Sequence, residues 1–160
     1  MLNLLGEHSC KVDSKGRVMF PAKLRKQLEP VISSGLVLNR DIFEKCLILY
    51  PKPEWDIVNQ EMSRLSRYDR KHQLFQRKFM KGATLVEFDA TGRLLIPAAL
   101  LDYAMITEGG NELVISGVGE KMEIWSKKQY DEVVLNADDD DLSFLIDDVR
   151  KDIERDPNTN

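Results

Sequence analysis

The chain has 160 residues, of which 42% are hydrophobic and 31% are charged, so it can form one substantial core or two small intertwined ones. No apolar run approaches the roughly 20 residues of a membrane helix, and the start, MLNLLGEHSC, lacks the features of a signal peptide. Cys10 and Cys46 have neither metal-site nor disulfide-framework spacing, so both thiols are expected to be reduced and buried.

The net charge of −4 hides a strong asymmetry between the two halves of the chain. Residues 1–81 contain 16 Lys and Arg against 9 Asp and Glu, a net charge of +7, whereas residues 82–160 contain 7 against 18, a net charge of −11. A polyanion responds to the local potential, so this segregation leaves nucleic-acid binding open despite the acidic total.

The first predicted unit begins with the stretch VDSKGRVMFP at residues 12–21. Asp13 and Gly16 occupy the first and fourth positions of a type I turn that a left-handed glycine closes, and residues 8–12 and 17–20 are predicted to be strands on either side. Pro21 suits the first turn of a helix, and PAKLRKQLEP would turn Leu24 and Leu28 inward.

The rest of the first unit and the connection after it follow a regular pattern. Residues 36–38 are predicted to be a buried strand, and LILYPKPEWDIV (47–58) a strand followed by a helix. The connector, residues 63–80, is predicted to be helical because its apolar residues recur at helical spacing. It is also basic, and both a solvated helix face and a nucleic-acid contact explain that charge.

A second copy of the unit begins 76 residues after the first, with FDATGRLLIP at 88–97. PAALLDYAM again predicts a helix, with Leu100 and Tyr103 inward, residues 113–115 a buried strand, and MEIWSKKQYDEV (122–133) a strand and helix. SGVGEK (116–121) lacks the spacing of a phosphate-binding loop and predicts a hairpin turn. The tail, residues 138–160, is predicted to be an acidic amphipathic helix followed by a disordered DPNTN.

The two copies predict an α+β fold with pseudo-twofold symmetry. Each copy alone would leave exposed strand edges, so we expect the halves to pair with each other in a β-barrel. The predicted organisation is a single domain over residues 1–137, made of repeats 5–62 and 81–134 joined by the connector 63–80, and followed by the tail.

The candidate binding residues lie at the two turns. Arg17 and Arg93 each follow the turn glycine, and the first copy adds Lys15 within the turn and Lys11 before it. An arginine on a stiff hairpin loses little entropy when it contacts phosphate or a guanine edge. The alternative is that Arg17 and Arg93 pair with Asp13 and Asp89 and only brace the turns.

The sequence gives no positive indication of an enzyme. His8 and His72 are the only histidines, and no Ser, His and acid arrangement is suggested by spacing. We therefore expect no catalytic residue, no metal site, no cofactor and no small-molecule substrate.

The chain resembles the MraZ family over about residues 5–135. The resemblance is carried by VDSKGRVMFP and FDATGRLLIP, with CLILYPKPEW after the first and EIWSKKQYDEV after the second. The resemblance implies an AbrB-like swapped-hairpin barrel. It also implies a cytoplasmic, nucleoid-associated bacterial regulator, usually a repressor, that binds short direct repeats in double-stranded DNA as a ring-shaped homo-oligomer. Its implied targets are its own promoter and the division and cell-wall gene cluster, and no membrane contact is expected.

By the same resemblance, the DNA-contacting motif covers Asp13, Lys15 and Arg17 in the first copy and Asp89 and Arg93 in the second, and its basic residues are expected to contact DNA. Lys11, before the first turn, and Thr91, at the position of Lys15, are further candidates for DNA contact. Asp13, Gly16, Asp89 and Gly92 are expected to shape the loops. Thr91 stands where the first copy has Lys15, so the second corner is expected to be the weaker electrostatic contact. The competing function is a protein–protein assembly module, in which the corners and the connector bind an acidic surface.

Overall fold

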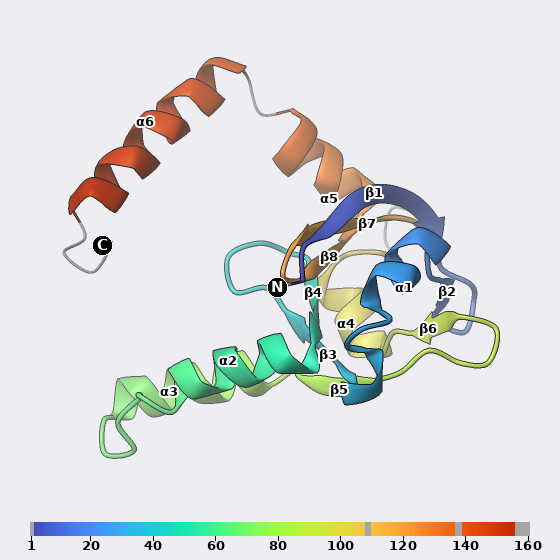
Figure 1. Cartoon of the computed structure of the whole chain (residues 1–160), viewed down its shortest axis with the longest axis horizontal. Helices are drawn as coiled ribbons and strands as arrows, with labels where there is room; N and C mark the ends of the chain where they lie inside the picture. Colours follow the sequence, from blue (N-terminus) through green and yellow to red (C-terminus); the bar gives the residue numbers. More distant parts are fainter. Residues whose placement is uncertain (1, 108–109, 137–138, 156–160) are drawn as a thin grey trace. The chain divides into compact units, whose positions relative to one another are not determined.

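The computed structural model describes residues 2–107, 110–136 and 139–155. The chain divides into two compact units, residues 1–129 and 130–160 (Figure 1). No helix among the described residues has the length and apolar character required to cross a membrane.

The first unit is built on two antiparallel sheets. The larger has the strand order β1 (Leu4–Lys11), β7 (Glu112–Gly119), β8 (Met122–Ser126), β4 (Leu47–Pro51), β3 (Leu36–Arg40) and β5 (Thr84–Val86). The smaller is a ribbon of two short strands, β2 (Arg17–Met19) and β6 (Arg93–Leu95). The strands predicted on either side of each turn, and the predicted buried strands 36–38 and 113–115, are therefore present.

The two repeats exchange strands. β1 pairs with β7, and the equivalent strand of the second repeat, β5, pairs with β3. The registers also correspond, because Cys10 lies opposite Leu113 and Val86, 76 residues after Cys10, lies opposite Leu36. β2–β6 and β4–β8 likewise join one repeat to the other. The expected pairing of the two halves is thus confirmed, and the fold is α+β.

The hydrogen-bonded strands do not form one closed sheet, so the expected barrel is not confirmed. Among the described residues, β1 and β5 are the open edges of the larger sheet, and β2–β6 is a separate ribbon. The ladder is interrupted at each corner, where only the single bridges Val12–Val18 and Phe88–Leu94 connect the strands before and after the turn. Beyond these bridges, each second strand pairs with its counterpart from the other repeat.

A helix follows each ribbon strand and seals the core. α1 (Ala22–Leu28) and α4 (Ala98–Tyr103) both begin after a proline, as predicted. Leu24, Leu28 and Leu100 are buried, whereas Tyr103 is only half-buried against the core. A short 3₁₀ helix (Ile32–Ser34) follows α1, and β7 and β8 form the hairpin predicted around residues 116–121.

The connector is a helical hairpin, not one continuous helix. α2 (Lys52–Met62) and α3 (Arg70–Met80) lie side by side (Figure 1), with the Trp55 and Phe79 rings stacked at 6.0 Å. Residues 63–69 form turns, which corrects the prediction of a helix over 63–80. The Ser66 hydroxyl accepts from the Tyr68 amide and the Asp69 carboxylate from the first amides of α3, so side chains replace helical hydrogen bonds there.

The second unit is helical over its described part. α5 (Lys127–Tyr130) leads into it, followed by a π-helical segment (Asp131–Leu135) and α6 (Asp139–Arg155). The predicted amphipathic helix is therefore present. The apolar side chains that the sequence placed on one face of this helix are 43–57% exposed, and they belong to Leu142, Leu145, Ile146, Val149 and Ile153. Phe144 is 72% exposed. The predicted disordered end, residues 156–160, lies outside the described residues.

Candidate nucleic-acid interface

Corner one, residues 13–17, is a tight turn organised by one carboxylate. The Gly16 amide donates to the Asp13 carbonyl at 3.1 Å, and the Asp13 amide donates to the Arg17 carbonyl at 2.9 Å. Asp13 Oδ1 accepts from the amides of Lys15 and Arg17, both at 2.9 Å. Gly16 has φ +84°, the left-handed conformation that favours glycine. The predicted turn is confirmed.

Corner two, residues 89–93, repeats this geometry closely. The Gly92 amide donates to the Asp89 carbonyl at 3.0 Å, Gly92 has φ +85°, and Asp89 Oδ1 accepts from the amides of Thr91 and Arg93. One contact is added, because the Thr91 hydroxyl also donates to Asp89 Oδ1 at 2.8 Å. Thr91 therefore helps to shape this corner, and its expected contact with DNA stays a prediction.

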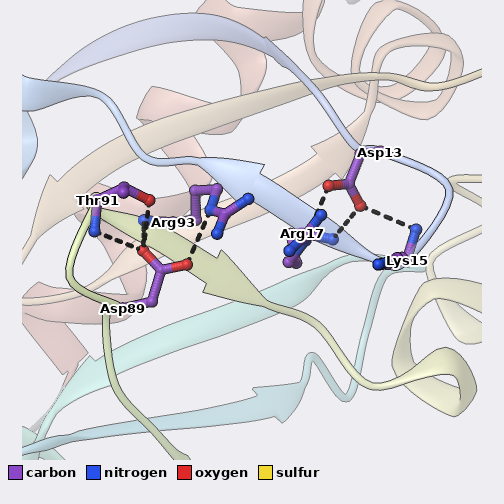
Figure 2. Close-up of polar contacts among 6 residues, drawn as sticks. All are labelled: Asp13, Lys15, Arg17, Asp89, Thr91 and Arg93. Atoms are coloured by element: carbon purple, nitrogen blue, oxygen red, sulfur yellow. Dashed lines mark hydrogen bonds and ion pairs between the residues drawn. The ribbon is translucent and has the colours of Figure 1, made fainter.

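Each corner arginine forms an ion pair with the aspartate of its own turn (Figure 2). Arg17 Nε donates to Asp13 Oδ2 at 2.9 Å, and Arg93 Nε donates to Asp89 Oδ2 at 2.8 Å. The bracing contact proposed as the alternative is thus present. It occupies only one edge of each guanidinium, since the terminal nitrogens donate no hydrogen bond to any described residue. With about a third of each side chain exposed, bracing and binding are compatible.

The hydrogen bonds within the corners also fix the charge of the two aspartates. Donation from the Arg17 amide, followed by that from Lys15 and by the guanidinium, holds the pKa of Asp13 below its usual range. The Arg93 amide, with the Thr91 and Arg93 side chains, holds the pKa of Asp89 well below its usual range. Both carboxylates are therefore ionised at neutral pH, and both guanidinium groups keep a fixed orientation.

The ribbon β2–β6 carries one corner at each of its two ends (Figure 2). Its inner face is formed by Val18 and Leu94, which are fully buried and lie opposite each other. Alternation along the strands turns the neighbouring residues outward. Arg17 lies opposite Leu95 and Arg93 lies opposite Met19, so the outer face carries two arginines and two exposed apolar side chains.

The remaining candidate residues lie close to corner one in the chain. Lys15 is exposed at the tip of the turn, and Lys11 is exposed at the end of β1, where its backbone lies opposite Glu112. Figure 2 shows Lys15 at the corner of repeat one, whereas Thr91 takes the same place in repeat two.

The basic residues of the connector form a separate exposed group on the helical hairpin. Three arginines border a hollow of about 560 Å³ at the turn between α2 and α3. The exposed basic residues are Arg64, Arg67, Arg70, Lys71, Arg77, Lys78 and Lys81. This agrees with a solvated helix face, and a role in DNA contact stays a prediction.

Sequence reasoning missed one cation at the site, Arg25 of α1. A Cβ atom at Gly92 would collide with Arg25 Nη1 and lie 2.6 Å from its Cζ, so this guanidinium lies directly against corner two. Leu101, 76 residues after Arg25, takes the equivalent place at Gly16, where a Cβ would lie 3.4 Å from its Cδ1. The 76-residue spacing pairs Arg25 with Leu101 in the sequence. What the sequence does not state directly is that each of these helix residues lies against the corner of the other repeat, as the exchange of strands implies.

A family model described as "MraZ protein, putative antitoxin-like" matches the chain twice, over residues 3–78 and 79–145. A relative from Christiangramia forsetii is 42% identical over 140 residues, 88% of each protein, and one from Flavobacterium psychrophilum is 42% identical over 134 residues, 84% of this chain and 83% of the relative. A third, from Marinobacter nauticus, is 35% identical over 81% of this chain and 85% of its own length. Each of the three is named transcriptional regulator MraZ. The two matches and these relatives show that the chain belongs to the MraZ family.

Proposed function

We propose that the chain is a sequence-specific DNA-binding transcriptional regulator. MraZ is a family of transcriptional regulators and not of enzymes. The observation that carries the proposal for this chain is the ribbon β2–β6, which holds two arginines on one outer face, each oriented by an ionised aspartate.

The size and shape of the ribbon β2–β6 are suited to the major groove of DNA. A two-stranded antiparallel ribbon fits the major groove of B-DNA, where arginine binds the O6 and N7 atoms of guanine through two parallel hydrogen bonds. Arg17 and Arg93 keep their terminal nitrogens for such a contact, while the Nε atoms remain bound to the corner aspartates. Because the corners are already rigid, little conformational entropy is lost on binding.

The other corner residues have supporting roles in this proposal. Lys15 and Lys11 contact phosphates beside corner one, and Thr91 lies at the corresponding tip of corner two. Asp13, Gly16, Asp89 and Gly92 shape the loops, as their hydrogen bonds and backbone conformations indicate. The DNA-binding domain extends over residues 1–137, with the tail 138–160 outside it.

The resemblance to MraZ carries the proposal further. It favours an AbrB-like barrel completed around the exchanged strands, and a ring-shaped homo-oligomer whose subunits each take one short direct repeat. Several weak contacts made by one ring would add up to strong binding. The expected targets are the chain's own promoter and the division and cell-wall gene cluster, with repression as the usual outcome, in the cytoplasm at the nucleoid.

The test is binding to the DNA upstream of the chain's own gene, measured by fluorescence anisotropy and footprinting. Arg17→Ala and Arg93→Ala are each expected to weaken binding by about 1–3 kcal/mol, because each removes a contact to a base or phosphate. The affinity of the unaltered protein should also fall steeply with salt. Arg150→Ala, an exposed arginine on α6, is the matched control and should bind like the unaltered chain.

Unchanged affinity in both corner variants would show that the arginines only brace the turns. If the protein does not bind this DNA even at low salt, the result would instead favour a protein–protein assembly module. The basic helical hairpin and the acidic α6 would be the first surfaces to examine in that case.

A further inference from the structure

The two corners differ in the cations that their own turns supply. Corner one has Lys15 at its tip, whereas Thr91 stands at the tip of corner two and directs its hydroxyl to Asp89. From the turns alone, corner two would present one cation where corner one presents two. The difference matters because each cation that neutralises a phosphate adds to the affinity for DNA.

Arg25 reaches corner two from the other repeat. Its helix α1 follows β2, and the Phe20 amide at the end of that strand donates to the Gly92 carbonyl at 3.1 Å. The buried side chains of Leu24 and Leu28 fix the helix against the core, and Arg25 Nε donates to the Phe20 carbonyl at 3.2 Å. These contacts place the guanidinium against Gly92, in the space that a side chain at this position would occupy.

A purely structural role does not require a cation at this place. The equivalent residue at corner one is Leu101, which is 6% exposed and covers Gly16 with a plain hydrocarbon. Arg25, in contrast, is half-buried, and no carboxylate lies within ion-pair distance of it among the described residues. Its terminal nitrogens donate no hydrogen bond to the described part of the chain.

The surroundings of Arg25 are open to a ligand. Residues of both α1 and corner two line a hollow of about 350 Å³, among them Arg25, Lys26 and Gly92. Glu29 and Asp89 also line the hollow. Both Asp89 oxygens already accept hydrogen bonds from Thr91 and Arg93, which leaves Arg25 Nη1 and Nη2 as donors for an incoming anion.

We propose that Arg25 binds a DNA phosphate beside corner two, so that each corner engages DNA with an arginine and a second cation. In corner one the second cation, Lys15, comes from the turn itself, whereas in corner two it comes from a helix of the other repeat. This inference rests on the proposed DNA-binding function, and it predicts two cations at corner two, where the turn residues alone predicted the weaker electrostatic contact.

The test compares Arg25→Leu with the unaltered chain on DNA from upstream of its own gene. Leucine reproduces the packing that Leu101 provides at corner one, so the melting temperature should change little. The affinity should fall by about 5- to 150-fold, and the slope of log affinity against log salt should decrease by about one charge. A phosphate contact predicts the same factor of loss on the natural site and on a scrambled sequence.

Two further variants make the result specific to the charge at corner two. Lys23→Ala removes a cation from the exposed surface of the same helix, about 200° around it from Arg25, and should leave binding unchanged. Adding Thr91→Lys to Arg25→Leu returns a cation to corner two and should restore the lost salt slope. If Arg25→Leu lowers the melting temperature, Arg25→Gln, whose amide can still donate to the Phe20 carbonyl, replaces it in every comparison.

The inference would be overturned if the folded Arg25 variant kept both its affinity and its salt slope while Arg17→Ala and Arg93→Ala lost affinity. Loss of affinity with an unchanged slope would also overturn it, because that pattern indicates a positioning role without a phosphate contact. If the two corner variants bind as tightly as the unaltered chain, the proposed function itself fails, and the two failures are therefore distinguishable.

Discussion

At the scale of single residues, the aspartates explain how a short turn can orient a flexible side chain. Each accepts two backbone amides with one oxygen and the arginine Nε with the other. The guanidinium is thereby attached at its inner edge and free at its outer edge. In the proposed complex, Arg17 and Arg93 therefore meet DNA as oriented donors rather than as mobile charges.

The pH dependence follows from the direction of the pKa displacement. Since the pKa of Asp89 is lower in the folded than in the unfolded chain, its carboxylate stabilises the fold above the ordinary aspartate pKa of about 3.9. That stabilisation is lost as the pH falls through the lower, folded value. At neutral pH, where the proposed function operates, it is fully present.

Thr91→Ala tests which groups set this pKa. The substitution removes the hydroxyl that donates to Asp89 Oδ1 at 2.8 Å, so the pKa of Asp89 should rise while that of Asp13 stays unchanged. NMR titration of the aspartate carboxyl carbons measures both groups in one experiment, with Asp13 as the internal control. An unchanged pKa of Asp89 would mean that the backbone amides and the Arg93 guanidinium determine its ionisation without the hydroxyl.

At the scale of elements, the ribbon β2–β6 depends on its inner face. Val18 and Leu94 are fully buried and lie opposite each other, in a register that turns both arginines outward. A slip of one residue would bury an arginine and expose the core pair. The stability of the ribbon and the orientation of the proposed DNA contacts therefore have the same cause.

Leu94→Ala should lower the free energy of unfolding by about 2–5 kcal/mol, because it leaves a cavity beneath the ribbon. The matched control is its neighbour, since Leu95 is 57% exposed and Leu95→Ala should change stability by no more than about 0.5 kcal/mol. Urea unfolding followed by circular dichroism, at one protein concentration for all variants, measures both. Equal losses would contradict the assignment of inner and outer faces.

Much of this fold could be predicted from the sequence because the two copies share turn chemistry and apolar spacing. The Asp and Gly positions of each corner, the prolines before α1 and α4, and the buried strands are all local signals. The break between α2 and α3 was missed because helical spacing continues in the apolar residues, whereas Ser66 accepts a backbone amide in the turn and Asp69 caps the start of α3. The open sheet and the position of Arg25 depend on long-range pairing, which periodicity does not report.

At the scale of the whole molecule, neither repeat holds a complete set of strand partners. β1 of the first repeat pairs with β7 of the second, and β5 of the second repeat pairs with β3 of the first. Each of these strands therefore has its partner in the other repeat. The fold is therefore a property of the joined repeats. The proposed DNA-binding face likewise requires both, because β2 and β6 come from different repeats.

Residues 1–81 and 82–137, produced as separate fragments, should each fail to fold as monomers. Mixed in equal amounts, they should recover the circular dichroism spectrum of residues 1–137, because each supplies the strands that the other lacks. Analytical ultracentrifugation distinguishes a mixed complex from a fragment that pairs with a second copy of itself. A fragment that is folded and monomeric on its own would contradict the strand exchange.

Joining the two repeats in one chain also gives the DNA-binding surface a direction. Two identical copies of one repeat would present identical corners and would bind DNA with equal affinity in both orientations. Here Lys15 and Thr91 differ, as do Arg25 and Leu101, so the two ends of the ribbon are chemically distinct. A protein with two distinct ends can bind an asymmetric DNA site in one orientation only. Successive copies bound to direct repeats can then all have the same orientation.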